Sequence, residues 1–249
     1  MFSDIEKENI LNQISSFFDK QVIENHVKNT EKLVDIKKIS FNPFLIAYLS
    51  RFAFGDASPR SIAKAILYPR VLGTSISTSF GSAIQKLSSQ VLSGFASTTS
   101  GIDIEYKDSF TNRHIYCQLK SGPETINKDD VKTICDHFKD LARLAKTNGS
   151  KDINPLTDCV VGILYGSRED LSANYKRIEA EGYTVKIGQE FWESFTGDKD
   201  FYNDLIETIT TVNSNKINHV LENTVEKLAK SISENSSMIP GIEMSANKM

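Results

Sequence analysis

The sequence predicts a mixed α/β (α+β) fold, in which a central sheet is flanked by helices and preceded by a helical subdomain. Two observations point to this class. Apolar residues recur at helical spacing through the first seventy residues, whereas short alternating or continuous apolar runs between residues 101 and 187 are separated by amphipathic segments. The resulting order of strand, strand, helix, strand, helix and strand is typical of a mixed sheet with helices on its faces.

Three amphipathic blocks form the predicted N-terminal subdomain, residues 1–73. Apolar residues repeat at helical spacing from residue 4 to about residue 29 and again after Asn42, and a third helix opens at Ser58-Pro59. A serine hydroxyl caps a helix and proline suits the first helical position, so this start is well defined. The many aromatic side chains of the blocks need a partner surface. The subdomain either packs as a cover on the α/β core, or it mediates dimerisation or wraps around DNA.

A predicted β-hairpin carries the most informative polar residues. Two short alternating runs, Gly101–Tyr106 and Ile115–Gly122, are joined by a charged segment rich in turn formers. Successive residues of a strand point to opposite faces, so Gln118 and Lys120 project from the same side of the second strand. Asp103 lies on the first strand. We therefore expect the three side chains to be neighbours.

The remaining elements complete the predicted sheet. A helix opens at Asn127 and crosses to residues 158–166, a near-continuous apolar run typical of a strand buried on both faces. A shorter strand is predicted at residues 183–187. The only tryptophan, Trp192, lies among aromatic residues at helical spacing and is interpreted as core packing. Residues 231–249 are small and polar, and we expect a flexible tail there.

Length and composition describe a globular protein. The 249 residues suffice for one large domain or two smaller ones, and 39% of them are hydrophobic and 24% charged. The net charge of −3 argues against a broad basic field for nucleic acids, but a basic cleft remains compatible with it, because charges are screened beyond about 8–10 Å. The three scattered cysteines suggest neither a disulfide framework nor a zinc site, and we interpret them as reduced packing residues.

The sequence also predicts where the protein works. Its N-terminal residues are acidic and amphipathic, and no apolar run approaches the ~18–20 residues of a membrane span. We therefore expect a cytoplasmic protein that does not bind membranes.

The hairpin residues suit metal-assisted phosphodiester chemistry. Asp103 supplies an anionic oxygen, Gln118 an amide oxygen and Lys120 an ammonium, a set that fits Mg²⁺ held against a phosphodiester. We expect these three residues to be catalytic, and Asp103, Gln118 and the Leu119 backbone carbonyl to bind the metal. A structural interpretation of each stays open. Asp103 could pair with Arg113 or Lys120, and an exposed lysine on an edge strand often only prevents aggregation.

The hairpin resembles a nuclease family. An acid, a spacer of ten to twenty residues and acid-x-Lys on the next strand resembles the PD-(D/E)XK nuclease superfamily, with Gln118 where an acid is usual. The run Tyr116–Pro123, continuing through Thr125–Val131, looks like type II restriction endonucleases of the PmeII-type group, which is similar to enzymes cutting interrupted GG/CC-rich palindromes. The resemblance covers roughly residues 74–202 and implies a restriction-endonuclease-like core, which we place at residues 74–230.

The resemblance implies a Mg²⁺-dependent, sequence-specific endonuclease of double-stranded DNA. A palindromic site is met by a two-fold protein, so we expect a homodimer, with a cognate DNA methyltransferase encoded nearby. The amide of Gln118 removes one negative charge and should weaken metal binding. Related nucleases often carry a glutamate near the position of Gln85, and here again an amide stands in its place.

Polar residues beside the hairpin are candidates for DNA contact. Ser100 lies in a small-residue loop before the first strand, and Asn127, Lys128 and Lys132 follow the second strand. Hydroxyl, amide and ammonium groups all bind phosphate oxygens. For each of them an interpretation as an ordinary solvated residue stays open.

Three classes of function therefore remain. The first is the endonuclease. The second is a catalytically inactive or weakened DNA-binding relative, which the amides of Gln118 and Gln85 make credible. The third is a non-nuclease helical interaction protein in which the acid and the lysine are incidental. The first would cut a plasmid into discrete bands, the second would shift DNA without cutting it, and the third would do neither.

Overall fold

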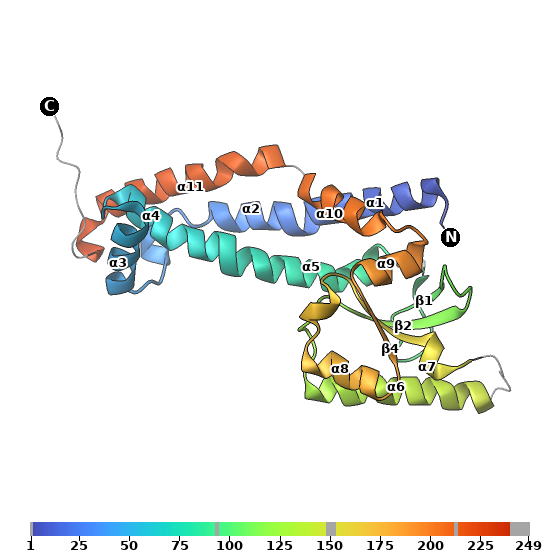
Figure 1. The fold of residues 1–249 in the computed structure, drawn as a ribbon. Helices are drawn as coiled ribbons and strands as arrows, with labels where there is room; N and C mark the ends of the chain where they lie inside the picture. Colours follow the sequence, from blue (N-terminus) through green and yellow to red (C-terminus); the bar gives the residue numbers. More distant parts are fainter. Residues whose placement is uncertain (1, 93–94, 148–152, 212–213, 240–249) are drawn as a thin grey trace. The chain divides into compact units, whose positions relative to one another are not determined.

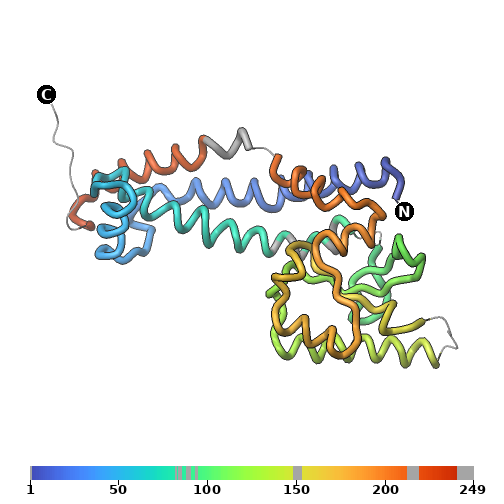
Figure 2. The backbone as a smooth tube through the Cα atoms, in the orientation of Figure 1, coloured from blue at the N-terminus to red at the C-terminus, as the bar shows by residue number. Residues whose placement is uncertain are grey.

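The chain folds into two compact units, which are drawn in Figure 1. This computed structural model describes residues 2–92, 95–147, 153–211 and 214–239. One unit comprises Met1–Phe17 and Ser82–Thr210, and the other comprises Phe18–Gly81 and Thr211–Met249. The backbone, traced as a tube in Figure 2, passes between the units three times. Each unit is thus assembled from two stretches of chain, and its limits differ from the expected ranges 1–73, 74–230 and 231–249.

The first unit is built on a four-stranded mixed sheet with the strand order β1-β2-β3-β4. The strands are β1 (Ile104–Lys107), β2 (His114–Lys120), β3 (Cys159–Ile163) and β4 (Thr184–Ile187). β1 and β2 are antiparallel, whereas β2–β3 and β3–β4 are parallel pairs. Parallel neighbours need crossover connections, which here contain helices (Figure 1). The predicted mixed sheet with flanking helices is confirmed.

Helices cover both faces of the sheet because β3, one of its two inner strands, is apolar on both faces. The helices of this unit are α1 (Asp4–Phe18), α6 (Lys128–Thr147), α7 (Pro155–Asp158), α8 (Ala173–Ala180), α9 (Gln189–Thr196) and α10 (Phe201–Thr211), with a short 3-10 turn, η5 (Arg168–Asp170). Every residue of β3 is buried, as its continuous apolar run predicts. Phe138 of α6 and Tyr175 of α8 share one core cluster with β3 residues such as Val161.

On the other face, α9 lies against β3. A Cβ added at Gly162 would come within 2.7 Å of the Phe191 ring, so glycine allows the close approach of strand and helix. Trp192 is fully buried, and its Nε1 donates a hydrogen bond to the Leu164 carbonyl at 2.8 Å. The interpretation of Trp192 as core packing is confirmed.

A buried ion pair fastens the β1–β2 turn to this unit. The Asp108 carboxylate accepts hydrogen bonds from Lys186 Nζ at 2.6 Å and from Ser194 Oγ at 2.5 Å. Its other oxygen accepts one from the Thr111 N–H at 2.8 Å. Burial raises the pKa of Asp108, but the hydrogen bonds from Lys186 and Ser194 outweigh it and hold that pKa well below its ordinary value. The turn of the predicted hairpin is therefore joined to β4 and α9.

The second unit is helical. Its elements are η1 (Asp19–Ile23), α2 (Glu24–Glu31), η2 (Ile36–Lys38), α3 (Pro43–Phe54), α4 (Pro59–Tyr68), η3 (Pro69–Ser75), α5 (Ile76–Gln90, which runs on into the first unit), α11 (Ser214–Glu234) and η6 (Ser236–Met238). The predicted cap at Ser58 is confirmed, since its hydroxyl accepts from the Ser61 N–H at 3.3 Å. Ile62 and Leu67 of α4 share a core with Leu228 of α11.

The last described residues belong to this core. Helix α11 runs through Ser231 to Glu234, and Ile232 and Ile239 are buried. We expected a flexible tail over residues 231–249; residues 231–239 instead join this core, and residues 240–249 lie outside the described residues.

Two expectations from composition can be compared with the structure. Cys117, Cys135 and Cys159 are free and buried, which confirms their interpretation as reduced packing residues. Within the described ranges, every helix is too short or too polar to cross a membrane.

Candidate active site

The hairpin register brings Asp103 beside the second strand. Ile104 pairs with Cys117, and the Asp103 N–H donates to the Cys117 carbonyl at 3.0 Å. Asp103 therefore lies just before the paired stretch of β1, beside Cys117 and Leu119 of β2. The predicted adjacency of the two runs is confirmed at the level of the backbone.

The Asp103 carboxylate is tied to β2. Asp103 is exposed, and its Oδ2 accepts a hydrogen bond from the Leu119 N–H at 2.7 Å. Within a strand, the N–H and C=O of one residue point to the same side, so the Leu119 carbonyl also faces the β1 side of β2. Asp103 and the Leu119 carbonyl thus both present oxygen atoms on the β1 side of β2.

Gln118 is buried and held by its amide nitrogen. Its Nε2 donates to the Gly101 carbonyl and contacts His137 Nδ1 at 2.7 Å. Because an amide nitrogen has two hydrogens, both are used, and His137 accepts at Nδ1. Among the described residues no partner is found for Gln118 Oε1. Ser172 Oγ is the only fully buried side-chain atom without a partner in those residues, so Oε1 is not fully buried. Oε1 therefore keeps access to solvent.

His137 and Gly101 enclose Gln118, and sequence reasoning assigned neither to the site. Gly101 has φ +77°, and a Cβ added there would come within 2.3 Å of His137 Cγ. Only glycine combines this conformation with this closeness. His137 could have been found from the apolar face of α6. It follows Ile134 by three residues and precedes Leu141 by four, which puts it on the buried side of the helix.

Lys120 ends β2 and is partly exposed. It aligns with Ile163 of β3, and its carbonyl accepts from the Leu164 N–H at 3.0 Å. No hydrogen bond or ion pair of its ammonium is found in the part of the chain that the structure describes. The edge-strand interpretation of Lys120 does not hold, because β2 lies between β1 and β3. Arg113, the other proposed partner of Asp103, binds Asp158 through Nη2 at 2.6 Å.

A second acid on β1 is engaged elsewhere. Glu105 accepts hydrogen bonds from Ser97 and Thr99 and pairs with His114 Nε2 at 2.7 Å. Burial raises the pKa of Glu105, but the hydrogen bonds from Ser97 and His114 outweigh it, so that pKa lies below its ordinary value. Glu105 fastens the loop before β1 to the hairpin. His114 itself is exposed.

The oxygens at the hairpin are of the kind that bind a hard divalent cation, but only one of the three groups carries a negative charge. Carboxylate, amide and carbonyl oxygens are the donors that Mg²⁺ and Ca²⁺ take, and Asp103, Gln118 and Leu119 offer one of each. The described residues contain no group of three or more histidines, cysteines and acids that could hold a metal ion. A cation here would therefore be balanced by a single protein carboxylate.

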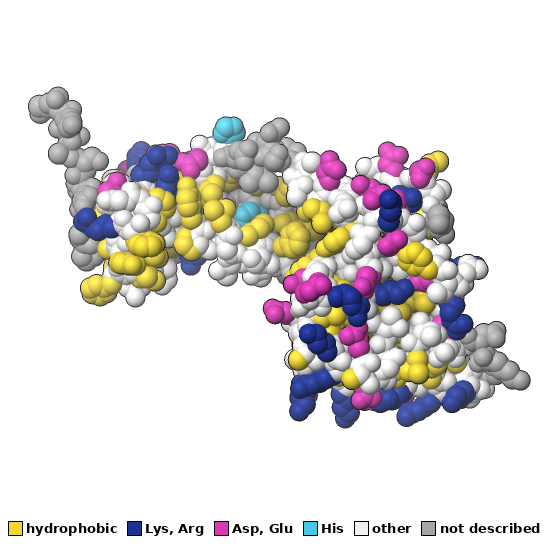
Figure 3. All heavy atoms as spheres, viewed as in Figure 1, with side chains coloured by type: hydrophobic (Ala, Val, Ile, Leu, Met, Phe, Trp, Pro, Cys, Tyr) yellow, Lys and Arg dark blue, Asp and Glu magenta, His cyan; other side chains and the backbone are white. Residues whose placement is uncertain are grey.

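The candidate DNA-contact residues lie on the surface of the same unit. Ser100 is exposed in the loop beside Gly101, and Lys128 and Lys132 lie one turn apart on α6, where they line a shallow hollow of about 380 Å³ with Arg177. Lysines and arginines gather over α6 and α8 in Figure 3. Asn127 is also exposed, but its Oδ1 caps α6 by accepting from the Asp129 N–H at 2.8 Å.

One candidate cannot be located. The side chain of Gln85, the second amide in an acidic position, lies outside the residues that the structure describes.

Comparison with known families covers most of the chain. The model of a family described as type II restriction endonuclease EcoO109I matches residues 4–218, which include the first helices, the sheet and the hairpin. No curated protein matches the chain. The expectation of a type II restriction endonuclease, first drawn from the residues around Gln118, is thereby confirmed at the level of the family.

Proposed function

The chain belongs to the type II restriction endonuclease EcoO109I family, and from this premise we propose that it cuts double-stranded DNA at a specific sequence in a Mg²⁺-dependent reaction. One observation carries the proposal. The Asp103 carboxylate is bound to the β2 backbone at Leu119, between Gln118 and Lys120 in sequence. This arrangement supports membership of the PD-(D/E)XK superfamily, and we propose the PmeII-type group as its subgroup.

Three oxygens would hold the metal ion. These are an oxygen of the Asp103 carboxylate, Gln118 Oε1 and the Leu119 carbonyl. When bound, Mg²⁺ lowers the pKa of a coordinated water and draws negative charge from the phosphate. Gln118 is oriented for this role because both of its N–H groups are occupied by Gly101 and His137, so the oxygen is the end left for a ligand.

Lys120 would act on the reacting phosphate. An ammonium donates up to three hydrogen bonds and accepts none, so it can orient the attacking water and stabilise the charge that develops on the phosphoryl oxygens. Lys120 is partly exposed, and its ammonium has no partner among the described residues. Both features support this role.

The proposal extends to DNA contact and to the partners of the enzyme. Four residues would bind the backbone phosphates and set the register on the duplex. These are Ser100, Lys128, Lys132 and Asn127, the last through its side-chain N–H groups. A two-fold DNA site would be read by a homodimer. A cognate methyltransferase encoded nearby would protect the host DNA in a restriction-modification system, and both proteins would work in the cytoplasm, where that DNA lies.

Plasmid digestion tests the proposal. The purified protein, incubated with a sequenced plasmid and Mg²⁺, should give discrete fragments with a common end sequence. Lys120→Ala should reduce cutting by more than about a hundredfold, as the loss of one group that stabilises transition-state charge does. Lys107→Ala is the matched control, since Lys107 is an exposed lysine at the far end of β1, and it should cut normally. Full cutting by Lys120→Ala would refute its role.

One observation favours a second candidate function. Gln118 replaces a carboxylate in a site with a single acid ligand, so an inactive DNA-binding relative remains the alternative. Such a protein would retard DNA fragments of one sequence in a gel without cutting them at any Mg²⁺ or Mn²⁺ concentration. The third class, a non-nuclease interaction protein, has no support from the family match.

A further inference from the structure

His137 presents a second ring nitrogen beside the candidate active site. Its Nδ1 lies 2.7 Å from Gln118 Nε2, and the same amide nitrogen donates to the Gly101 carbonyl. A carbonyl oxygen only accepts, so the nitrogen end of the amide must face Gly101, and both of its hydrogens are donated. His137 Nδ1 therefore accepts and carries no hydrogen. A histidine ring keeps at least one N–H group, so the hydrogen is on Nε2.

The ring of His137 is placed so that Nε2 lies away from Gly101. The three atoms nearest to a Cβ added at Gly101 are Cγ, Nδ1 and Cδ2 of His137, all within 2.8 Å. The Cγ end of the ring thus lies against the glycine, and Nε2 belongs to the opposite end. A ring that is already held in one orientation loses little freedom when it binds a ligand, which favours binding.

The N–H of His137 Nε2 has nothing to donate to within the described residues, and it is not fully buried. His137 as a whole is half-buried on α6. Ser172 Oγ is the only fully buried side-chain atom without a partner in those residues, so Nε2 keeps contact with solvent. The structure therefore holds an oriented donor that is open to a ligand.

Given the proposed endonuclease function, on which this assignment rests, we propose that His137 Nε2 donates a hydrogen bond to a backbone phosphate oxygen of the bound DNA. An N–H group that cannot accept selects an acceptor, and half or more of the hydrogen bonds between proteins and DNA go to phosphate and sugar oxygens. Ser100, a candidate for phosphate contact, directly precedes Gly101. Both donors thus belong to the same contact between the loop before β1 and α6.

A neutral donor suits this place better than a cation. The proposed metal site next to it has a single carboxylate, from Asp103, to balance the charge of a divalent ion. An ammonium or guanidinium beside Gln118 would repel that ion and weaken its binding. His137 can bind the phosphate without adding positive charge to the site.

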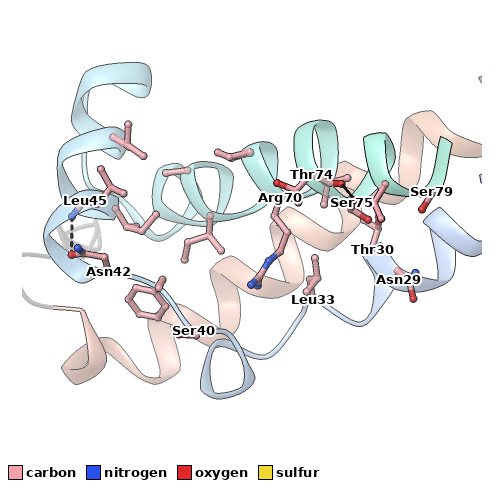
Figure 4. Close-up of a pocket in the computed structure, with 18 residues that line it drawn as sticks. Asn29, Thr30, Leu33, Ser40, Asn42, Leu45, Arg70, Thr74, Ser75 and Ser79 are labelled. Carbon is pink, nitrogen blue, oxygen red and sulfur yellow. Dashed lines mark hydrogen bonds between the residues drawn. The ribbon is translucent and has the colours of Figure 1, made fainter. Parts of the chain in front are cut away.

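The helical unit contains another unpartnered donor, which is less well suited to phosphate. Figure 4 shows Arg70 pointing into a hollow of about 790 Å³, and no partner is found for its guanidinium among the residues that the structure describes. Arg70 is exposed, and no hydrogen bond of a neighbour orients it. Leu33, Leu45 and Ile66 make much of the lining apolar, which disfavours a hydrated phosphate.

Two substitutions separate the two nitrogens of His137. In His137→Asn, the amide oxygen can take the place of Nδ1 as acceptor for Gln118, but nothing replaces the N–H of Nε2. In His137→Gln, the longer side chain carries an N–H near the place of Nε2, but Gln118 loses its acceptor. Each variant is the matched control of the other.

Fluorescence anisotropy with labelled duplexes measures DNA binding by the full chain. His137→Asn should weaken binding about tenfold, both in Ca²⁺ and in EDTA, because one hydrogen bond to a charged oxygen is lost. His137→Gln should bind as tightly as the unchanged protein in EDTA and more weakly only in Ca²⁺, where Gln118 is a proposed ligand. The dependence of affinity on salt should be the same in all three proteins, since no cation is removed.

The loss in His137→Asn should also be equal for duplexes of unrelated sequence, because a phosphate carries no sequence information. A loss for one sequence only would assign Nε2 to a base and overturn the phosphate contact. Tight binding by His137→Asn would overturn it too. A larger loss in His137→Gln than in His137→Asn in EDTA would show that His137 acts only through Gln118, which also contradicts the proposal.

Nitrogen-15 NMR of the histidine rings tests the unchanged protein without any substitution. His137 should carry its hydrogen on Nε2, and this signal should shift when a duplex is added in EDTA. The signal of His26, which is buried in the other compact unit, should not move. A hydrogen on Nδ1, or an unmoved Nε2 signal in the DNA complex, would refute the assignment.

These outcomes are distinguishable from those of the endonuclease proposal. A protein that binds DNA through His137 but does not cut would refute the nuclease and leave the contact standing. Normal binding and cutting by His137→Asn would do the reverse, and a protein that binds no duplex would overturn both.

Discussion

The Asp103 carboxylate accepts a hydrogen bond from the Leu119 N–H at 2.7 Å and so joins the acid to the strand of Gln118 and Lys120. One carboxylate oxygen serves the hairpin, and the other is the oxygen that we propose as a metal ligand. The proposal therefore gives this acid two separable roles, a structural one that needs an acceptor and an electrostatic one that needs a charge.

Asp103→Asn separates these roles. The amide oxygen still accepts from Leu119, so we expect a change in unfolding free energy of less than about 0.5 kcal/mol. Asp103→Ala removes the acceptor and should cost about 1 kcal/mol. Both variants should lose the rise in melting temperature that Mg²⁺ or Ca²⁺ produces in the unchanged protein. Thermal unfolding with and without the cation measures both effects, and a full cation response in Asp103→Asn would contradict the metal role.

Gly101→Ala tests the close contact with His137. The left-handed conformation costs a non-glycine residue about 1–2 kcal/mol, and the new methyl group would overlap the imidazole, so the loop must move. We expect an unfolding free energy lower by about 2 kcal/mol or more and weaker DNA cleavage. Gly81→Ala is the control. Nothing lies within 4 Å of a Cβ at Gly81, which is in α5, and alanine there should stabilise the protein by up to about 1 kcal/mol.

Gln118→Glu restores the usual acid and should change metal binding and stability in opposite directions. The new carboxylate adds a negative charge, so the cation concentration at half-maximal stabilisation should fall. Without a cation, it loses the hydrogen bonds to Gly101 and His137 and faces a carbonyl oxygen, which should lower the unfolding free energy by about 1–3 kcal/mol. Calcium titrations followed by melting temperature would measure both. Unchanged cation affinity would show that Gln118 is not a ligand.

The buried pair of Asp108 and Lys186 predicts an acid-sensitive fold. The folded pKa of Asp108 is held below its unfolded value of about 3.9, so its stabilising contribution is present above that pH and is lost as the pH falls below it. Asp108→Asn should lower the unfolding free energy at pH 7 by about 2 kcal/mol, since Lys186 loses its partner.

Denaturant unfolding between pH 2.5 and pH 7 measures this contribution, and the Asp108→Asn variant should show a smaller loss of stability at low pH than the unchanged protein. Asp140→Asn is the control, because Asp140 forms an exposed pair with Arg143 on α6 and should change stability by less than about 0.5 kcal/mol. Equal pH profiles for the Asp108 variant and the unchanged protein would contradict the assignment.

Much of the fold was predictable because it follows from local patterns. The helix start at Ser58, the strand at residues 159–163 and the β1–β2 hairpin each depend on neighbouring residues, whose propensities and spacing act whatever the rest of the chain does. The same is true of the adjacency of Asp103 and β2, since a short connection between two strands makes them pair.

The surroundings of Gln118 were not predictable in this way. His137 reaches Gln118 only because α6 packs on one face of the sheet, and Gly101 reaches both because the loop before β1 lies against them. Lys186 meets Asp108 across 78 residues of sequence for a similar reason.

The sequence by itself determined which segments are helices and strands and which residue types stand at the hairpin, because backbone propensity and hydrophobic spacing are properties of short stretches. The tertiary structure alone decided which partners hold the Gln118 amide and that α11 joins α4 in one core. These depend on which apolar faces pack together, and that choice is made by contacts between residues far apart in the chain.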